Sequence, residues 1–227
     1  MAKETPETRT SIDELNDSLT GIEQKIQNNK KLLVWPIVAV VAVAAIILVY
    51  VYLIRQPGIK SANDAIGQAD MTALMGNDST ALVQYEAVAA DHGYDAGNRA
   101  NLNAAIILYK QGKYQEALDY VQKYDANDKV IAAAAKSLEG DCLVNLDKND
   151  EAIAAFDQAI KISDKNPAYT PMFIMKKATV LRAQKKYKEE AAAYQEIVDE
   201  YPQYGASIQV DIEKYLDRAK IDAGEVK

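Results

Sequence analysis

Histidine and cysteine, which often serve as proton carriers, nucleophiles and metal ligands, occur only once each in this 227-residue sequence. The only histidine, His92, stands where a helix is expected to end, and a cation there interacts favourably with the helix dipole. The only cysteine, Cys142, falls inside an expected helix as a small apolar side chain and cannot form an intramolecular disulfide. The turn at 147–150 is too short for a calcium loop and lacks its distal glutamate.

The motifs that mark common enzymes and cofactor sites are also missing. The sequence contains no glycine-rich phosphate loop, no His-Glu-x-x-His, no Cys-x-x-Cys and no Gly-x-Ser-x-Gly. We therefore expect no enzymatic activity, no metal and no cofactor. Binding is left as the function to be explained.

The stretch that organises the chain is residues 32–54, which contain neither a charge nor an amide side chain. As a helix of about 35 Å, the stretch would cross a hydrocarbon core about 30 Å thick. Trp35 lies near one end, and Tyr50 and Tyr52 lie near the other, as is typical of the membrane–water boundary. The apolar run is longer than a signal-peptide core and no Ala-x-Ala site follows it, so we predict an uncleaved transmembrane helix in contact with the lipid bilayer.

Basic residues on both sides of the span indicate its orientation. Lys25, Lys30 and Lys31 precede the span, and Arg55 and Lys60 follow it. Positive residues prefer the cytoplasmic side, so we expect a cytoplasmic N-terminus and a C-terminal domain outside. A single span without a polar residue cannot line an ion or proton path by itself, which argues against transport.

The segment before the span, residues 1–31, is polar but contains apolar residues at heptad spacing. These residues are Ile12, Leu15, Leu19, Ile22 and Ile26. We predict a short helix at 11–28 that pairs with a second copy, giving a homo-oligomer, or with another protein. A juxtamembrane helix without a fixed partner is the alternative, because short isolated helices are barely stable in water.

The formal net charge of −7 belongs to the part of the chain after the span. Residues 1–55 carry six basic and six acidic side chains, so the whole excess falls on residues 56–227. An acidic domain without a Lys/Arg cluster argues against nucleic acid as a partner.

Beyond the span, helical stretches rich in alanine, leucine and glutamate follow one another, with no convincing strand. Gln56-Pro57-Gly58 is expected to break the span helix and to form a linker at 55–59. The short connections between the later stretches predict antiparallel helix pairs, so the expected fold class is all-α.

Three segments of this domain repeat, with small residues at equivalent positions: Ala105, Gly140 and Ala178. The residues that follow at offsets of 3, 12 and 16 are Leu108, Ala117 and Val121, then Leu143, Ala152 and Phe156, then Leu181, Glu190 and Tyr194. The small residues would allow the two helices of each unit to approach each other closely.

This pattern resembles the tetratricopeptide repeat, a helix–turn–helix unit of about 34 residues. The segments 108–118, 149–160 and 185–194 carry the resemblance, which implies an α-solenoid with three such repeats over 98–202. Glu190 stands where the pattern expects a small residue, and a local shift that brings in Ala191 is the alternative. A divergent helix pair at 60–97 and a C-terminal capping helix and tail at 203–227 would flank the repeats.

The layout of the whole chain is similar to a bacterial family with a cytoplasmic segment, one span and a periplasmic tetratricopeptide domain. The ancillary subunit of the bacterial secretory translocon is of this type. The resemblance implies a single-pass inner-membrane scaffold for other proteins, near the export channel or with periplasmic chaperones. The alternatives are a structural subunit that assembles through its span and heptads, and a docking platform that faces the cytoplasm.

In tetratricopeptide arrays the first helix of each unit lines the concave face, and its outward side chains are the expected protein-binding residues. They are Arg99, Leu102, Ile106, Tyr109 and Lys110, then Ser137, Asp141 and Asn145, then Met172, Met175 and Arg182. The mixture of apolar, polar and methionine side chains favours docking of a helix or an extended peptide. The alternative is that these side chains are solvated or pack against the neighbouring unit.

Overall fold

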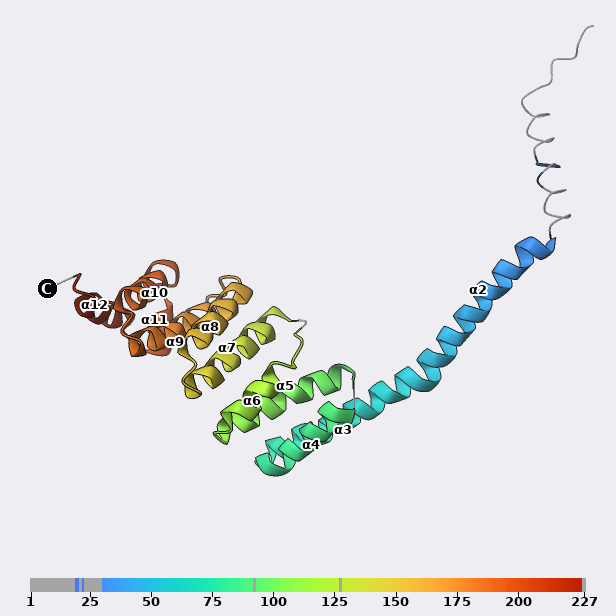
Figure 1. Cartoon of the computed structure of the whole chain (residues 1–227), viewed down its shortest axis with the longest axis horizontal. Helices are drawn as coiled ribbons and strands as arrows, with labels where there is room; N and C mark the ends of the chain where they lie inside the picture. Colours follow the sequence, from blue (N-terminus) through green and yellow to red (C-terminus); the bar gives the residue numbers. More distant parts are fainter. Residues whose placement is uncertain (1–18, 21, 23–29, 92, 127, 226–227) are drawn as a thin grey trace, which may run out of the picture. The chain divides into compact units, whose positions relative to one another are not determined.

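The structure is a computed structural model that describes residues 19, 20, 22, 30–91, 93–126 and 128–225. In these described residues every regular element is a helix, which confirms the all-α prediction (Figure 1). The chain divides into two compact units, and the boundary falls between Gly58 and Ile59.

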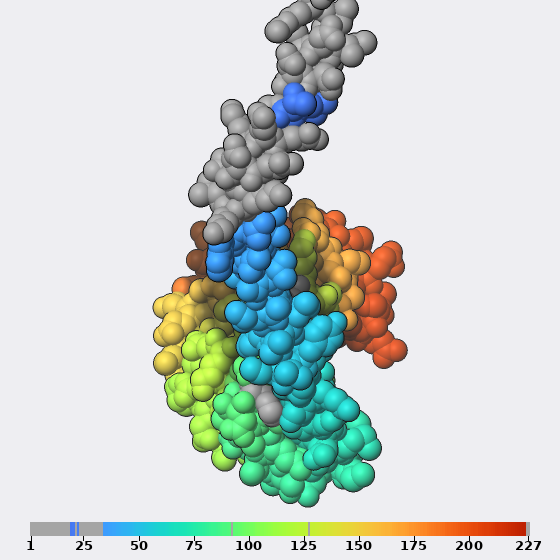
Figure 2. Space-filling model, turned by 90° about the vertical axis from the view of Figure 1, so that its right-hand side faces the viewer, coloured from blue at the N-terminus to red at the C-terminus, as the bar shows by residue number. Residues whose placement is uncertain are grey.

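The first unit contains the apolar helix α2 (Lys30–Tyr50) and a π-helical turn, η1 (Val51–Arg55). The helical run that starts at Val34 is long and apolar enough to cross a membrane, by length and composition. None of its most apolar window is buried within the structure, and Figure 2 shows the exposed surface of α2 in blue.

Residues 55–59 are helical, so the prediction of a break and a linker at this place is wrong. Helix α3 (Gln56–Leu74) begins directly after η1, and Pro57 is its second residue. The backbone N–H of Gln56 donates to the Val51 carbonyl, five residues earlier. Proline is tolerated in the first turn of a helix, and a wide π turn before it allows the helix to continue without a break.

The second unit consists of helices that follow one another in pairs, from cyan to red in Figure 1. After α3 come α4 (Asp78–Asp91), α5 (Asp95–Lys110), α6 (Tyr114–Val121), α7 (Lys129–Asn145), α8 (Asn149–Ser163), α9 (Thr170–Ala183), α10 (Tyr187–Glu200), α11 (Tyr204–Ile208) and α12 (Ile212–Asp222). From α4 to α10 each helix packs against the next, and α12 packs against α10. Contact between sequence neighbours is the organisation of a solenoid.

The turn inside each predicted repeat has the same backbone geometry. A residue with positive φ lies seven positions after the small residue of each unit: Gly112 (76°), Asp147 (59°) and Lys185 (58°). The next residue donates its N–H to the carbonyl five positions earlier, at 2.9–3.0 Å, which is a common way to end a helix. The third repeat therefore keeps the register of the other two, with no shift towards Ala191.

The first helix pair has this geometry as well. Gly76, with φ 79°, lies seven positions after Ala69, and the N–H that follows it donates to the carbonyl five positions earlier at 3.2 Å. Ala69 is fully buried, as are Ala105 and Ala178. The α3–α4 pair is thus a further repeat in the same register, 36 residues before the repeat of Ala105.

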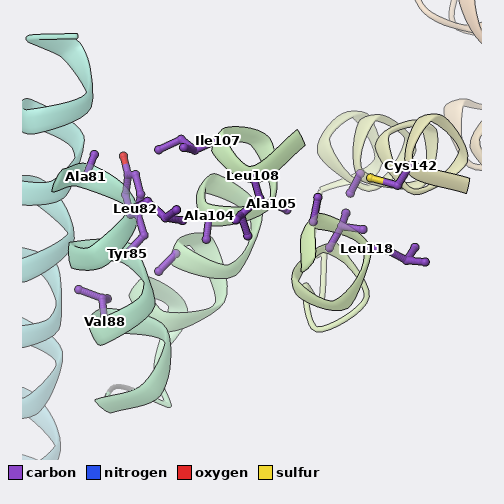
Figure 3. Packing of buried hydrophobic residues seen from close by; sticks show 14 of the residues in the cluster. Ala81, Leu82, Tyr85, Val88, Ala104, Ala105, Ile107, Leu108, Leu118 and Cys142 are labelled. Atoms are coloured by element: carbon purple, nitrogen blue, oxygen red, sulfur yellow. The ribbon is translucent and has the colours of Figure 1, made fainter. Parts of the chain in front are cut away.

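Three hydrophobic clusters run through this unit, and the smallest joins Ala133, Ala159 and Phe173 of α7, α8 and α9. The first extends from α3 to Val180 of α9, and Figure 3 shows its middle part, with Ala104, Ala105 and Leu108 of α5 between α4 and the α6–α7 pair. The second joins α9 and α10 to α12 through residues such as Ile174, Ile197 and Leu216. Because each cluster spans several helix pairs, no pair completes its core alone.

The tightest contact inside a repeat is between α7 and α8. A Cβ atom added at Gly140 would lie 2.6 Å from Cε1 of Phe156, whose ring is enclosed by the core. Real Cβ atoms do not approach other heavy atoms so closely, so the absence of a side chain at Gly140 sets the distance between these helices.

We predict that Gly140→Ala lowers the free energy of unfolding by about 1–3 kcal/mol, because the enclosed Phe156 ring cannot move aside without strain. Gly67→Ala in α3 is the control, since nothing lies within 4 Å of its added Cβ. Helix propensity should make Gly67→Ala stabilising by about 0.5–1 kcal/mol. Urea unfolding of the full chain in detergent, followed by circular dichroism, measures both, and effects of the same sign would contradict the contact.

Candidate functional site

The predicted binding residues lie on α5, α7 and α9, and the structure shows what each of them contacts. We use "first-helix face" for these residues together with Asp70, Asn103 and Lys176, which the sequence analysis did not select. Polar contacts on this face join the first helix of one repeat to the first helix of the next.

Asp70 of α3 joins the first two repeats. Its Oδ1 accepts hydrogen bonds from Tyr85 Oη at 2.7 Å and from Asn103 Nδ2 at 3.2 Å, and its Oδ2 accepts from Arg99 Nη2 at 3.1 Å. Burial, and then the neighbouring Asp70, raise the pKa of Tyr85, so its phenol stays protonated and donates. Arg99 is therefore paired within the protein, through a contact exposed enough to contribute little to stability.

Tyr109 and Asn145 connect α5 to α7. Asn145 Nδ2 donates to the Asp141 backbone carbonyl at 2.8 Å and to Tyr109 Oη at 3.4 Å. The Tyr109 ring also meets Tyr114 edge to face, with ring centroids 5.4 Å apart. Burial, and then the charge of Asp141, raise the pKa of Tyr109. Three predicted residues are thus brought together at this point.

Lys176 connects α9 to α7. Its Nζ donates to Asp141 Oδ2 at 2.5 Å and to Ser137 Oγ at 2.9 Å. Ser137 is buried, and burial raises the pKa of the Asp141 carboxyl, while the Lys176 ammonium partly offsets this effect. A serine beside a lysine can act as a nucleophile and base, but here the lysine is paired with Asp141 and the serine is enclosed. We therefore interpret the contacts of Lys176 with Ser137 and Asp141 as a structural link between two repeats.

Arg182, the last predicted residue, is occupied by two carboxylates. Its Nη1 donates to both carboxylate oxygens of Glu190 at 3.2 Å, and its Nη2 donates to Asp222 Oδ2 at 2.8 Å. Glu190 is fully buried, and Arg218 lies 3.6 Å from its Oε1. For Arg182 the structure favours packing against the neighbouring helices over contact with a partner.

The apolar members of the face, together with Lys110, divide into two groups. Leu102 packs against the first hydrophobic cluster, and Met172 and Met175 pack against the second. Ile106 and Lys110 instead stay exposed and line a surface cavity between α3, α4 and α5. Among the predicted residues these two have the most accessible place for a partner.

The residues that the sequence analysis missed, Asp70, Asn103 and Lys176, occupy positions that recur between repeats, and Asp141, which it did select, occupies one of the same positions. Asp70 and Asp141 each directly follow the small residue of a repeat, and Asn103 and Lys176 each stand two positions before the small residue of the next. Comparing polar residues at fixed offsets, across four repeats instead of three, would have found both pairs.

Cys142 lies next to this network but does not belong to a reactive site. The thiol is fully buried, and burial, followed by the charges of Asp141 and Glu139, raises its pKa to about 12. A protonated and enclosed thiol is inert, so Cys142 has the packing role expected of it.

The predicted oligomerisation residues are only partly described. Leu19 and Ile22 are helical and exposed. Ile12, Leu15 and Ile26 lie outside the described residues, as does His92. Pairing through the heptads stays a prediction.

Comparison with known proteins agrees with the repeat geometry. The family model described as "Tetratricopeptide repeat-like domain" matches residues 59–179, and one described as "Tetratricopeptide repeat" matches residues 174–204. No curated protein matches this chain in sequence.

Solved structures resemble the chain in fold. A crystal structure of MamA protein aligns with a TM-score of 0.59 at 17% sequence identity, covering 73% of this chain and 84% of that one. A tetratricopeptide repeat protein from Parabacteroides merdae aligns with a TM-score of 0.55 at 14% identity, covering 72% of this chain and 59% of that one. At such identities the likeness concerns the fold.

We predict that Lys176→Met lowers the free energy of unfolding by about 1–3 kcal/mol, because the half-buried Asp141 loses its counter-charge and Ser137 loses its donor. Lys129→Met is the control. The side chains of Lys129 and of its partner Asp164 are 75% and 73% exposed. Lys129→Met should therefore lower the free energy of unfolding by less than about 0.5 kcal/mol.

The pH dependence of this loss follows from the Asp141 carboxyl. Its pKa in the folded chain lies above the usual value, and removing Lys176 raises it further. The variant's deficit should therefore be complete at neutral pH and shrink as the pH falls through the raised pKa towards 3.8. Urea unfolding at several pH values measures the deficit, and a constant deficit would contradict the contact.

Proposed function

The chain belongs to the tetratricopeptide repeat-like domain family, and on that premise we propose that it is a single-pass membrane protein whose repeat domain holds other proteins at the membrane surface. The tetratricopeptide fold is a scaffold for protein–protein interaction. Our proposal adds three parts to this general role: the membrane anchor, its orientation and the site that contacts the partner.

The observation that carries the proposal is the apolar helix joined directly to the repeats. Trp35, Ile46 and Leu53 are among its exposed side chains, and none of its most apolar window is buried. Exposing so much apolar surface to water is unfavourable, whereas a bilayer would cover it. Helix α3, the first helix of the first repeat, begins directly after η1, with no break at Pro57.

Basic residues before α2 and at its start, Lys25, Lys30 and Lys31, support an orientation with the N-terminal segment in the cytoplasm. The layout resemblance noted in the sequence supports a bacterial inner membrane, with the repeat domain in the periplasm. In that compartment the repeats would act beside the export channel or with periplasmic chaperones.

The polar contacts on the first-helix face support binding of a partner over chemistry. Asp70, Asp141 and Arg182 each bond to neighbouring helices, so their groups are held in place and neutralised. Such a network keeps the first helices of successive repeats in register. The exposed side chains between the links, Ile106 and Lys110 above all, are then presented on a rigid surface.

We predict that Ile106→Asp removes the partners that co-purify with the full chain from membranes in mild detergent, because it places a charge at the centre of the contact. Ile208→Asp is the matched control, since Ile106 and Ile208 are both 38% exposed and Ile208, in α11, does not line the cavity between α3, α4 and α5. Quantitative mass spectrometry should show the loss for Ile106→Asp alone. Retention of every partner by Ile106→Asp would contradict the proposed site.

A further inference from the structure

A cavity of about 490 Å³ opens between α3, α4 and α5. Its apolar walls come from Ala73, Leu74, Ile106 and Ile107, and Figure 3 shows Ile107 close to the α4 helix. Binding sites usually have volumes of about 300–1,000 Å³ and combine apolar walls with a few polar groups. The α3–α5 cavity has both properties.

Exposed apolar side chains continue from this cavity along the end of α3. Leu74 and Met75 are 81% and 79% exposed, and Met71 stands one helical turn before them. Residues at positions i, i+3 and i+4 share one face of a helix, so the three form a continuous apolar edge. Clustered apolar exposure beside a cavity marks a contact surface, and methionine adapts to partners of different shape.

The charges at the cavity indicate which partner fits. Asp70 already has three donors inside the protein. Asp78 also lines the cavity and is half-buried, and among the described residues no hydrogen bond or ion pair reaches it. A carboxylate that has lost part of its hydration gains from an incoming cation. Lys110 is exposed to water and gains less from an anion.

The charge of the whole domain points in the same direction. The net charge of −7 lies entirely on residues 56–227, so its field attracts basic segments and repels acidic ones.

We propose that the α3–α5 cavity binds a basic amphipathic helix of a partner protein, which places a large apolar side chain in the cavity and a lysine or arginine against Asp78. This inference rests on the proposed function and names the chemistry of the partner. A helix fits because the cavity lies among three helices and the apolar edge of α3 extends it, which is the arrangement of a helix-in-groove interface.

The test uses the full chain in detergent and three fluorescent 18-residue probes, with protein-free detergent as the blank. The first probe is a leucine–lysine helix with one apolar face, the second replaces its lysines by glutamate, and the third scrambles the first so that the apolar face is lost. Fluorescence anisotropy should show binding of the first probe alone.

The variants separate this site from general attraction to an acidic protein. Leu74→Asp should weaken binding of the first probe about tenfold, although it adds a negative charge, and Asp78→Asn should weaken it about threefold to tenfold. Val83→Asp is the matched control and should leave binding unchanged, because Val83 is 64% exposed on α4 and does not line the cavity.

Equal binding by the Leu74→Asp and Val83→Asp chains, or tighter binding of the glutamate probe, would overturn the inference. If this happens while Ile106→Asp still loses its membrane partners, the partner chemistry is wrong and the proposed function stands. If Ile106→Asp loses no partner, the site of contact in the proposed function is contradicted as well.

Discussion

The close approach of the two helices inside each repeat is the contact on which the rest of the structure depends. The residues that allow it have a methyl group or no side chain at all: Ala69, Ala105, Gly140 and Ala178. At Gly140 even a methyl group would overlap the Phe156 ring. With the helices this close, the same left-handed turn can connect them in every repeat, and the repeats can stack with one continuous register.

The common register of the repeats also explains how polar contacts hold the first-helix face together and how the array of repeats ends. Asp70 and Asp141, at equivalent positions, each accept a hydrogen bond from the first helix of the next repeat. In the last repeat Glu190 replaces the small residue of the second helix, and Arg182 and Arg218 neutralise it. A buried carboxylate is costly without such partners, and α12, which supplies Arg218, occupies the place where a further repeat would otherwise stack.

Local features of the repeat could be predicted from the sequence because they depend on residues close together in the chain. The period, the all-α class and the small residue of three repeats follow from spacing alone. The repeat of Ala69 was missed because Thr72 stands where the other repeats have leucine. The helix through Pro57 was missed because the π-helical turn before it, which allows the helix to continue past a proline, could not be recognised in the sequence. Contacts across repeats, such as that of Lys176 with Asp141, depend on which residue of the neighbour lies opposite, which a single sequence does not reveal.

The central claim is that one apolar helix holds the repeat domain on the outer side of a membrane, and labelling with a membrane-impermeant maleimide tests it most directly. The buried Cys142 should stay silent, so an engineered cysteine at the exposed Lys161 of α8 reports alone. Our account predicts that Lys161→Cys is labelled in cells whose outer membrane has been permeabilised, and that Ala2→Cys is labelled only after the inner membrane is broken. Labelling of Ala2→Cys in intact spheroplasts, with Lys161→Cys protected until lysis, would contradict it.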